Sequence, residues 1–177
     1  MKQHSFAMLA ALGICASLNG CASPAKPSTM VPQTVHVQKR SAHSVSVVTS
    51  GGQATNPLWT SQVSNKGFAT ALQDAIEKHG VFSRVIRSGD ADYKLDVRLV
   101  RLQQPAVGFN LRVGSEVAWK LINTHSGQAV WEETIIRPYT ASMGEALVAM
   151  VRLRKANEGS IRENIKAGLE RISTLPL

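Results

Sequence analysis

Residues 93–99 read YKLDVRL, and this stretch decides the fold. Apolar and polar side chains alternate along it, and the alternation returns at residues 109–121, which read FNLRVGSEVAWKL. Because side chains along a strand point to opposite faces in turn, both stretches predict strands with one buried face and one wet face. Turn residues at 103–108 and 123–128 connect these strands to each other and to a third strand at 130–136, which predicts an antiparallel meander.

Two shorter strands and a helix precede this meander. Residues 44–49 alternate between apolar and polar, which predicts a first strand. From about Asn65, apolar residues recur every three or four positions, and Gly80 stands where a left-handed C-cap would end a helix. A second short strand is expected at residues 81–86, before a glycine-containing turn.

The last part of the chain predicts helix. Ser142 and Glu145 have the spacing of a capping box, in which a hydroxyl and a carboxylate satisfy the unpaired amides of a helix start. A second box follows at Ser160 and Glu163. Residues 143–173 are therefore expected to be helical, and the second box leaves open whether they form one helix or two.

The predicted order is strand, helix, four strands, helix. Helices that cover one face of such a sheet give an α+β fold, a two-layer sandwich in which an antiparallel meander sheet carries helices packed on one face. This domain is expected to occupy residues 44–177. A signal peptide at residues 1–20 and a lipidated cysteine with a flexible, disordered tether at residues 21–43 would precede it.

The first residues have the features of an export signal. A single fixed positive charge precedes an apolar run at 6–16 that is too short to span a bilayer, which takes about 20 residues. The run leads to LNGC at residues 18–21, which resembles the bacterial lipobox, where the cysteine is acylated and becomes the new N-terminus. The resemblance makes Cys21 the lipidation site. The same residues also fit a small-x-small cleavage site of a secreted, unlipidated product, and both outcomes stay open.

The stretch after Cys21 predicts a tether. Residues 21–43 are rich in proline and polar side chains and show no helical period. At about 5 to 6 Å times the square root of its length, such a coil holds a domain on the order of 25 Å from the lipid surface. Ala22, in place of an aspartate, resembles the residue after the cysteine in lipoproteins sent to the outer membrane. Cys15 lies in the discarded signal, so Cys21 is the sole cysteine of the mature chain.

The residue pattern does not predict an enzyme. The chain lacks Gly-x-Ser-x-Gly and His-Glu-x-x-His motifs and any paired metal-ligand spacing, so neither a metal nor a cofactor is expected. His79 stands at a helix end and His125 in a turn, where each suits a structural role. Asp90 and Asp92 lack the further oxygen ligands of a calcium loop. Two tryptophans of the meander are expected in the core rather than on a glycan-binding platform.

Charge gives the candidate binding residues. The chain carries 20 Lys and Arg against 12 Asp and Glu, a net charge of +8. Arg152, Arg154 and Lys155 form a basic cluster, which is predicted to face anionic lipid headgroups, lipopolysaccharide phosphates or an acidic partner surface. A nucleic-acid partner is not expected, because export removes the protein from nucleic acid and no DNA-binding or RNA-binding motif is present.

Three short stretches carry a resemblance to a known family: ADYKL at residues 91–95, WKL at 119–121 and SGQAVW at 126–131. Together with the lipobox, they resemble small Gram-negative outer-membrane lipoproteins of the LpoB type, which are periplasmic accessory proteins. The resemblance implies an envelope setting and a role in docking on, or assembling, an envelope machine. The matching residues are strand and turn positions, so the resemblance implies no site residue.

These observations predict an outer-membrane lipoprotein on the periplasmic face, which acts as a non-enzymatic accessory or interaction module of the cell envelope. Its partner is expected to be an envelope protein or an anionic envelope component, with the membrane bound through the N-terminal lipid; the sequence predicts no oligomeric state. Strand addition at residues 45–49 is a candidate mode of binding. The alternative function is a binder or sensor of a small amphiphile, a lipid or a glycan, in a pocket between the helices and the sheet.

Overall fold

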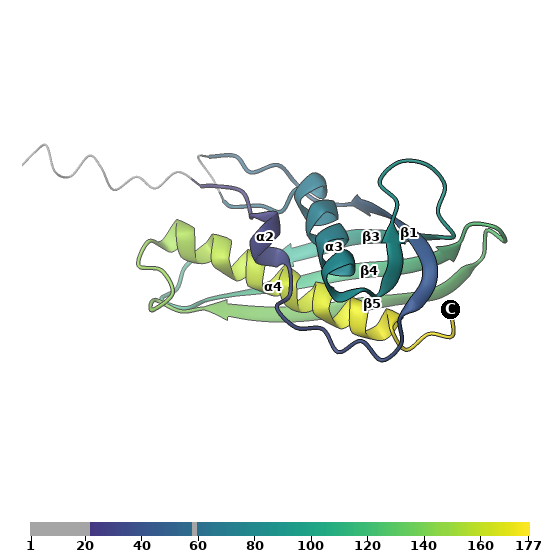
Figure 1. Ribbon diagram of the computed structural model, residues 1–177. Helices are drawn as coiled ribbons and strands as arrows, with labels where there is room; N and C mark the ends of the chain where they lie inside the picture. Colours follow the sequence, from purple (N-terminus) through teal and green to yellow (C-terminus); the bar gives the residue numbers. More distant parts are fainter. Residues whose placement is uncertain (1–21, 58–59) are drawn as a thin grey trace, which may run out of the picture.

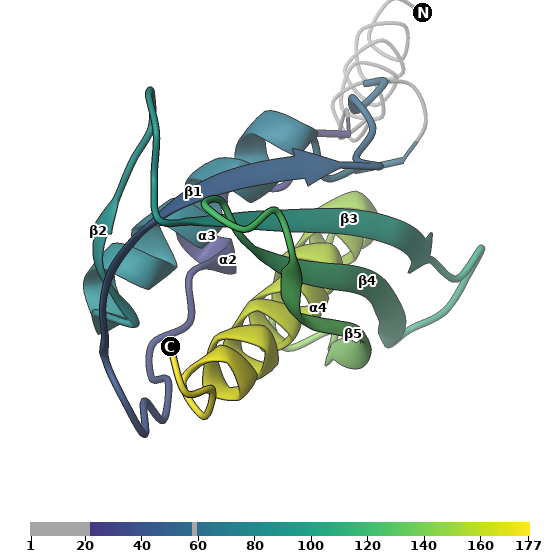
Figure 2. The same cartoon turned by 90° about the vertical axis from the view of Figure 1, so that its right-hand side faces the viewer.

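The computed structural model describes residues 22–57 and 60–177, and shows a five-stranded sheet with helices on one face (Figure 1). Seen from the end in Figure 2, the sheet curls around α4. The elements are α2 (Pro27–Met30), β1 (Ser41–Ser50), α3 (Asn65–His79), β2 (Phe82–Val85), β3 (Tyr93–Gln103), β4 (Leu111–Asn123), β5 (Ala129–Ala141) and α4 (Ala149–Ile172). The predicted α+β fold with helices packed on one face is confirmed. The predicted signal peptide lies outside the described residues.

The predicted meander forms the centre and one edge of the sheet. The strand order is β2-β1-β3-β4-β5, with β3, β4 and β5 paired antiparallel. β1 instead runs parallel to both β2 and β3, so the sheet is mixed rather than purely antiparallel. The segment from β1 through α3 to β2 explains this, because a crossing helix returns the chain to start the next strand in the same direction.

β1 lies between β2 and β3, but β2 is short. The register of the two ends where Val45 lies opposite Val85. Residues 46–50 continue to pair with β3, and within the described part of the chain β3 is their only strand partner. In the candidate stretch for strand addition, residues 45–49, Val45 therefore has a neighbouring strand on both sides. The residues after it have a neighbouring strand, β3, on one side. Binding at this stretch stays a prediction.

The ends of β4 and β5 differ from the prediction. The alternating pattern placed Phe109 in a strand, whereas β4 begins at Leu111 and Phe109 is 80% exposed in the loop before it. The pattern misses this because Phe109 keeps the phase of the alternation after the strand has ended. β5 continues through Pro138 to Ala141, since it is an edge strand and can place a proline where no ladder hydrogen bond is needed.

Tryptophan joins the sheet to α4, as expected of a core residue. The indole of Trp119 is fully buried, and its Nε1 donates to Oδ1 of Asn164 at 3.0 Å. Gly168 lies against the ring, since a Cβ at that position would come within 2.5 Å of it. Trp131 is partly buried beside it, with the ring centroids 6.3 Å apart. α3 packs into the same core through fully buried side chains, of which the largest are Phe68, Leu72 and Ile76.

α3 begins and ends where the sequence predicts. The hydroxyl of Ser64 accepts a hydrogen bond from the N–H of Gly67 at 3.1 Å and caps the first turn. Gly80 has a φ of 63°, in the left-handed region, and its N–H donates to the carbonyl of Ile76 at 2.8 Å. A side chain would be strained in this conformation, so glycine ends the helix.

α4 is one continuous helix, which decides the question that the second capping box left open. It begins at Ala149, later than the first box indicates. Ser142 and Glu145 still form a turn, in which the N–H of Ser142 donates to the Glu145 carboxylate at 3.1 Å. Ser160 is buried and donates to the carbonyl of Arg137 at 2.8 Å, so the second box marks no restart. Among the residues that the structure describes, no helix has the length and apolar character to cross a membrane.

Residues 22–40, predicted as part of a flexible tether, are folded onto the domain. Met30 of α2 is fully buried, and the N–H of Lys26 donates to the Glu158 carboxylate at 2.9 Å. The tether prediction is wrong for these residues, because backbone hydrogen bonds to distant partners hold the segment and its composition does not reveal them. Three more N–H groups donate to carbonyls outside the segment: Ala22 to Pro57, Ala25 to Gln62 and Lys39 to Ser173.

Replacing Gly168 with alanine tests the contact between α4 and β4. The added methyl group would press on the buried Trp119 ring, and overpacking costs about 1 to 3 kcal/mol against a helix preference for alanine of about 1 kcal/mol. We expect urea denaturation to give a lower free energy of unfolding for Gly168→Ala. Gly144→Ala is the matched control, because its Cβ would meet only Ser142 Oγ, at 3.5 Å. Equal effects of the two substitutions would contradict the packing.

Candidate functional site

The described chain begins at one end of the domain, beside the first turns of α4 (Figure 1). Ala22 is 5% exposed, and its N–H donates to the carbonyl of Pro57 at 2.9 Å. The hydroxyl of Ser23 accepts a hydrogen bond from Nη1 of Arg154 at 2.5 Å. Cys21, the predicted lipidation site, lies outside the described residues and directly precedes Ala22 in the sequence. The chain is therefore fixed to the domain from its first described residue.

Arg152, the first of the three predicted binding residues, joins two loops at this end. It is 4% exposed, and its Nη1 donates to the carbonyl oxygens of Ala146, at 2.7 Å, and Leu147, at 3.1 Å. Its Nη2 lies 3.5 Å from the carbonyl oxygen of Gly108. The β3–β4 loop and the β5–α4 loop are thus held by one guanidinium group.

Arg154 and Lys155 also bind within the chain. Nε of Arg154 lies 3.5 Å from Oε1 of Glu158, one turn along the helix, and Glu158 is 4% exposed. Nζ of Lys155 donates to the carbonyl of Glu145 at 2.7 Å, in the β5–α4 loop. Arg152 is buried, and its Nη1 and Nη2 donors are directed at loop carbonyls, so it does not lie on an exposed basic surface. Binding of an anionic component by Arg154 and Lys155 stays a prediction.

The two loops that Arg152 joins carry three strongly exposed apolar side chains, which we call the apolar tips. Val107 and Phe109, in the β3–β4 loop, are 86% and 80% exposed, and Leu147, in the β5–α4 loop, is 82% exposed. Periodicity assigned Phe109 to a strand, and Leu147 falls in the segment 143–173 that was expected to be helical. Because neither loop continues the neighbouring element, both side chains lie outside the core. The sequence pattern therefore does not predict that the apolar tips are exposed.

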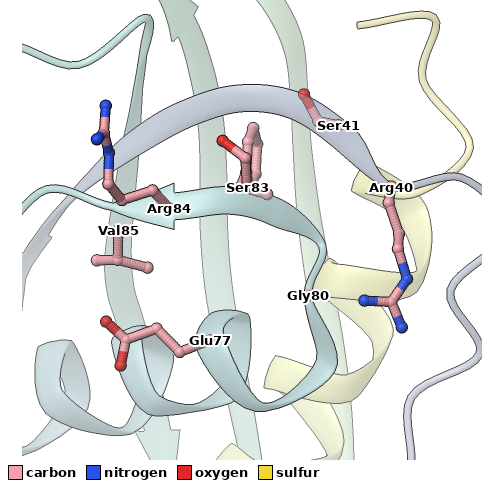
Figure 3. A pocket seen from close by; sticks show the side chains of 8 residues that line it. Arg40, Ser41, Glu77, Gly80, Ser83, Arg84 and Val85 are labelled. Carbon is pink, nitrogen blue, oxygen red and sulfur yellow. The ribbon is translucent and has the colours of Figure 1, made fainter.

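A hollow of about 450 Å³ lies between the end of α3 and β2 (Figure 3). Arg40 and Arg84 line it, and their guanidinium groups lie at opposite sides rather than converging. Glu77 also lines it, but its two carboxylate oxygens are bonded to Nη1 and Nη2 of Arg87 at 2.8 and 3.2 Å. The hollow thus presents separated charges and not a set of groups arranged around one ligand.

Four hollows of the described residues open beside β2, at the turns before β3 and after β4, and over strand ends, and not between the helices and the sheet, where a pocket was predicted. Side chains less than 2% exposed occupy the layer where the pocket was expected: Trp119, Phe68, Met30, Leu72, Ile76, Leu95, Leu121, Ile161, Ile165, Leu169 and Ile172. A filled core contradicts the expected amphiphile pocket.

His79 and Asp92 make contacts within the fold, whereas His125 is exposed. Nε2 of His79 lies 3.1 Å from the carbonyl oxygen of Pro32, and His125 is exposed in the β4–β5 turn. Oδ2 of Asp92 accepts from the N–H and the hydroxyl of Ser44 at 2.8 and 2.7 Å, and these hydrogen bonds hold the pKa of Asp92 below its usual value. Across the described residues, no three His, Cys, Asp or Glu side chains are grouped as metal ligands.

Comparison with known proteins shows a shared fold. No family model and no curated protein matches the chain. A DUF330-family protein from Xanthomonas campestris has a TM-score of 0.60 at 14% identity, over 80% of this chain and 92% of the other. An uncharacterised lipoprotein from Nitrosomonas europaea has a TM-score of 0.51 at 11% identity, over 78% and 87%. A hypothetical protein from Chlamydia trachomatis has a TM-score of 0.54 at 6% identity, over 75% and 96%.

Substituting Arg152 by methionine tests the link between the two loops. Hydrogen bonds to charged groups are worth about 1.5 to 3 kcal/mol, so we expect Arg152→Met to lower the free energy of unfolding by about that amount and to speed amide hydrogen exchange in both loops. Arg171→Met is the matched control on the same helix. Its side chain is 60% exposed and pairs with Glu133 at 3.7 Å, so its loss should change stability by less than about 1 kcal/mol. Similar effects of both variants would count against the link.

The hydrogen bonds of Asp92 predict a pH dependence. Because the folded-state pKa of this carboxyl is lowered, its contribution to stability is present above the unfolded pKa and is lost as the pH falls through the folded pKa. We expect wild type to have a higher Tm than Asp92→Asn near neutral pH, and the difference to shrink in acid below the usual aspartate pKa. A difference in Tm that stays constant over this range would show that the charge is not involved.

Proposed function

We propose that this chain is a lipoprotein anchored at the periplasmic face of the outer membrane through Cys21, and that it acts as a non-enzymatic accessory or interaction module of the cell envelope. The observation that carries the proposal is the position of the anchor residue. Cys21 ends a lipobox-like sequence and directly precedes Ala22, which is buried and hydrogen-bonded at one end of a folded domain. Acylation of Cys21 would attach that end to the membrane.

The shared fold supports the lipoprotein assignment. One protein with this fold, from Nitrosomonas europaea, is itself named a lipoprotein, and its chain is covered over 87% of its length. The fold does not carry function with it, because unrelated activities recur on the same scaffold. The lipobox-like residues therefore remain the direct support, and the fold agrees with them.

An accessory role fits the use that the chain makes of its polar side chains. Residues that could serve chemistry, such as Asp92, His79 and Glu158, bond to groups that hold loops, turns and the first described segment in place. Attachment to a membrane raises the local concentration of such a domain near partners in the same envelope. The partner is then an envelope protein or an anionic envelope component.

Replacing Cys21 with serine tests the anchor. We expect the mature wild-type protein to begin at an acylated residue 21, by mass spectrometry, and to sediment with outer membranes. Cys21→Ser should remain an unacylated precursor, because a hydroxyl does not replace the thiol in this modification. Cys15→Ser is the matched control and should behave like wild type, since Cys15 belongs to the segment that is removed.

The same pair of proteins tests the accessory role. Envelopes crosslinked with wild type should yield a specific envelope partner, and envelopes with Cys21→Ser should yield much less of it. Unchanged processing and membrane retention of Cys21→Ser would overturn the lipoprotein assignment. An acylated wild type that recovers no specific partner would overturn the accessory role alone.

A further inference from the structure

We propose that the domain rests directly on the bilayer, with the apolar tips Val107, Phe109 and Leu147 inserted among the lipid headgroups. This proposal rests on the acylation of Cys21 proposed above. It replaces the expected leash by a rigid attachment with a defined orientation.

The first step is the short connection between anchor and domain. Consecutive Cα atoms lie about 3.8 Å apart, and Ala22 is already held by its hydrogen bond to Pro57. Ser23 is held by Arg154, and Lys26 by Glu158. A diacylglyceryl group on Cys21 therefore brings this end of the domain to the headgroup level, and the coil of about 20 residues that would separate them is absent.

The second step is the location of the apolar tips. Both loops that carry them bond to Arg152, in the first turns of α4, and Ser23 bonds to Arg154, two residues further. Figure 1 shows the start of α4 and the start of the described chain at the same end of the domain, and the C-terminus at the other. The tips and the anchor point thus belong to one end of the molecule.

The third step is the shape of this surface. Val107, Phe109 and Leu147 are each 80% exposed or more, and they lie on two loops rather than on the face of one helix or strand. Protein interfaces have a closely packed core that excludes water, which needs a complementary surface. A bilayer surface deforms around single apolar side chains and binds in proportion to the apolar area that enters it. The carboxylate of Glu145, which lies in the same loop, is engaged with the N–H of Ser142 and the hydroxyl of Tyr139.

The lengths of β4 and α4 determine how far the other end of the domain would lie from the membrane. β4 joins the loop of Val107 and Phe109 to the turn of Ser126, and its 13 residues span about 43 Å. The 24 residues of α4 span about 36 Å in the same general direction (Figure 1). Docking through the tips would place the β4–β5 turn far from the lipid, where it faces the periplasm.

Site-specific fluorescence on the full, acylated protein tests this orientation. Because the thiol of Cys21 carries lipid, a single new cysteine can be labelled alone in Val107→Cys, Leu147→Cys or the control Ser126→Cys. Each protein is reconstituted in vesicles of phosphatidylethanolamine and phosphatidylglycerol that contain nitroxide-labelled lipid. We expect a blue shift of emission and strong quenching at positions 107 and 147, and neither effect at position 126.

A second pair of variants tests whether the exposed apolar side chains cause the insertion that the label at position 107 reports. Phe109→Ser with Leu147→Ser, in the Val107→Cys background, should reduce the quenching severalfold while acylation and Tm stay unchanged, because both side chains are exposed. Val130→Ser is the matched control, since Val130 is an exposed apolar residue near the β4–β5 turn. It should leave the quenching as it was.

Each failure has its own signature. An unacylated N-terminus overturns both the proposed function and the docking. An acylated protein with equal quenching at positions 107, 147 and 126 overturns the docking alone. A blue shift without quenching at 107 and 147, with crosslinks between two copies at these positions, assigns the tips to a second copy of the chain and also overturns the docking.

Discussion

The buried side-chain amide of Asn164 is the contact on which the rest of the structure depends. Its Nδ2 donates to the carbonyl oxygens of Ile135, at 2.8 Å, and Ser115, at 3.3 Å, and its Oδ1 accepts from the indole of Trp119. One residue of α4 thus pairs with polar groups of β4 and β5 in a dry interior, where an unpaired group costs about 1 to 3 kcal/mol. An apolar side chain could fill this space, but it would not determine which turn of the helix faces the tryptophan.

Periodicity predicts those parts of the fold in which one face is buried over a whole element. The alternation from Tyr93 and the helix from Asn65 are of this kind, and with them the order of strands and helices follows from the sequence. Periodicity does not predict the parallel pairing of β1 or the start of α4 at Ala149. They depend on contacts between residues far apart in the chain, such as that of Arg152 with Gly108.

The candidate site depends even more on contacts between distant residues, which the sequence pattern does not predict. The basic residues from Arg152 to Lys155 are visible in the sequence, but Arg152 and Lys155 donate to backbone carbonyls, which every residue has and which leave no mark in composition. Arg154 contacts the side chains of Ser23 and Glu158. Residues 22–40 look like a tether because their apolar members, Met30 among them, pack singly and without a period. Composition alone therefore does not predict how residues 22–40 are held against the domain. This contact decides whether a domain anchored through its N-terminal segment rotates freely or keeps one orientation.

α4 connects these features into one rigid body. Its middle fixes the sheet through Asn164, and its first turns hold both loops through Arg152 and the start of the described chain through Arg154. A domain on a long flexible linker samples a range of positions, and its partner can lie at any distance from the membrane that the linker spans. Under the proposed acylation of Cys21, a domain attached through this helix would lose less orientational freedom on binding, because the membrane would already have removed it. It would then serve only partners that present their binding surface at the level of its far end, so rigid attachment would select the partner by height as well as by chemistry.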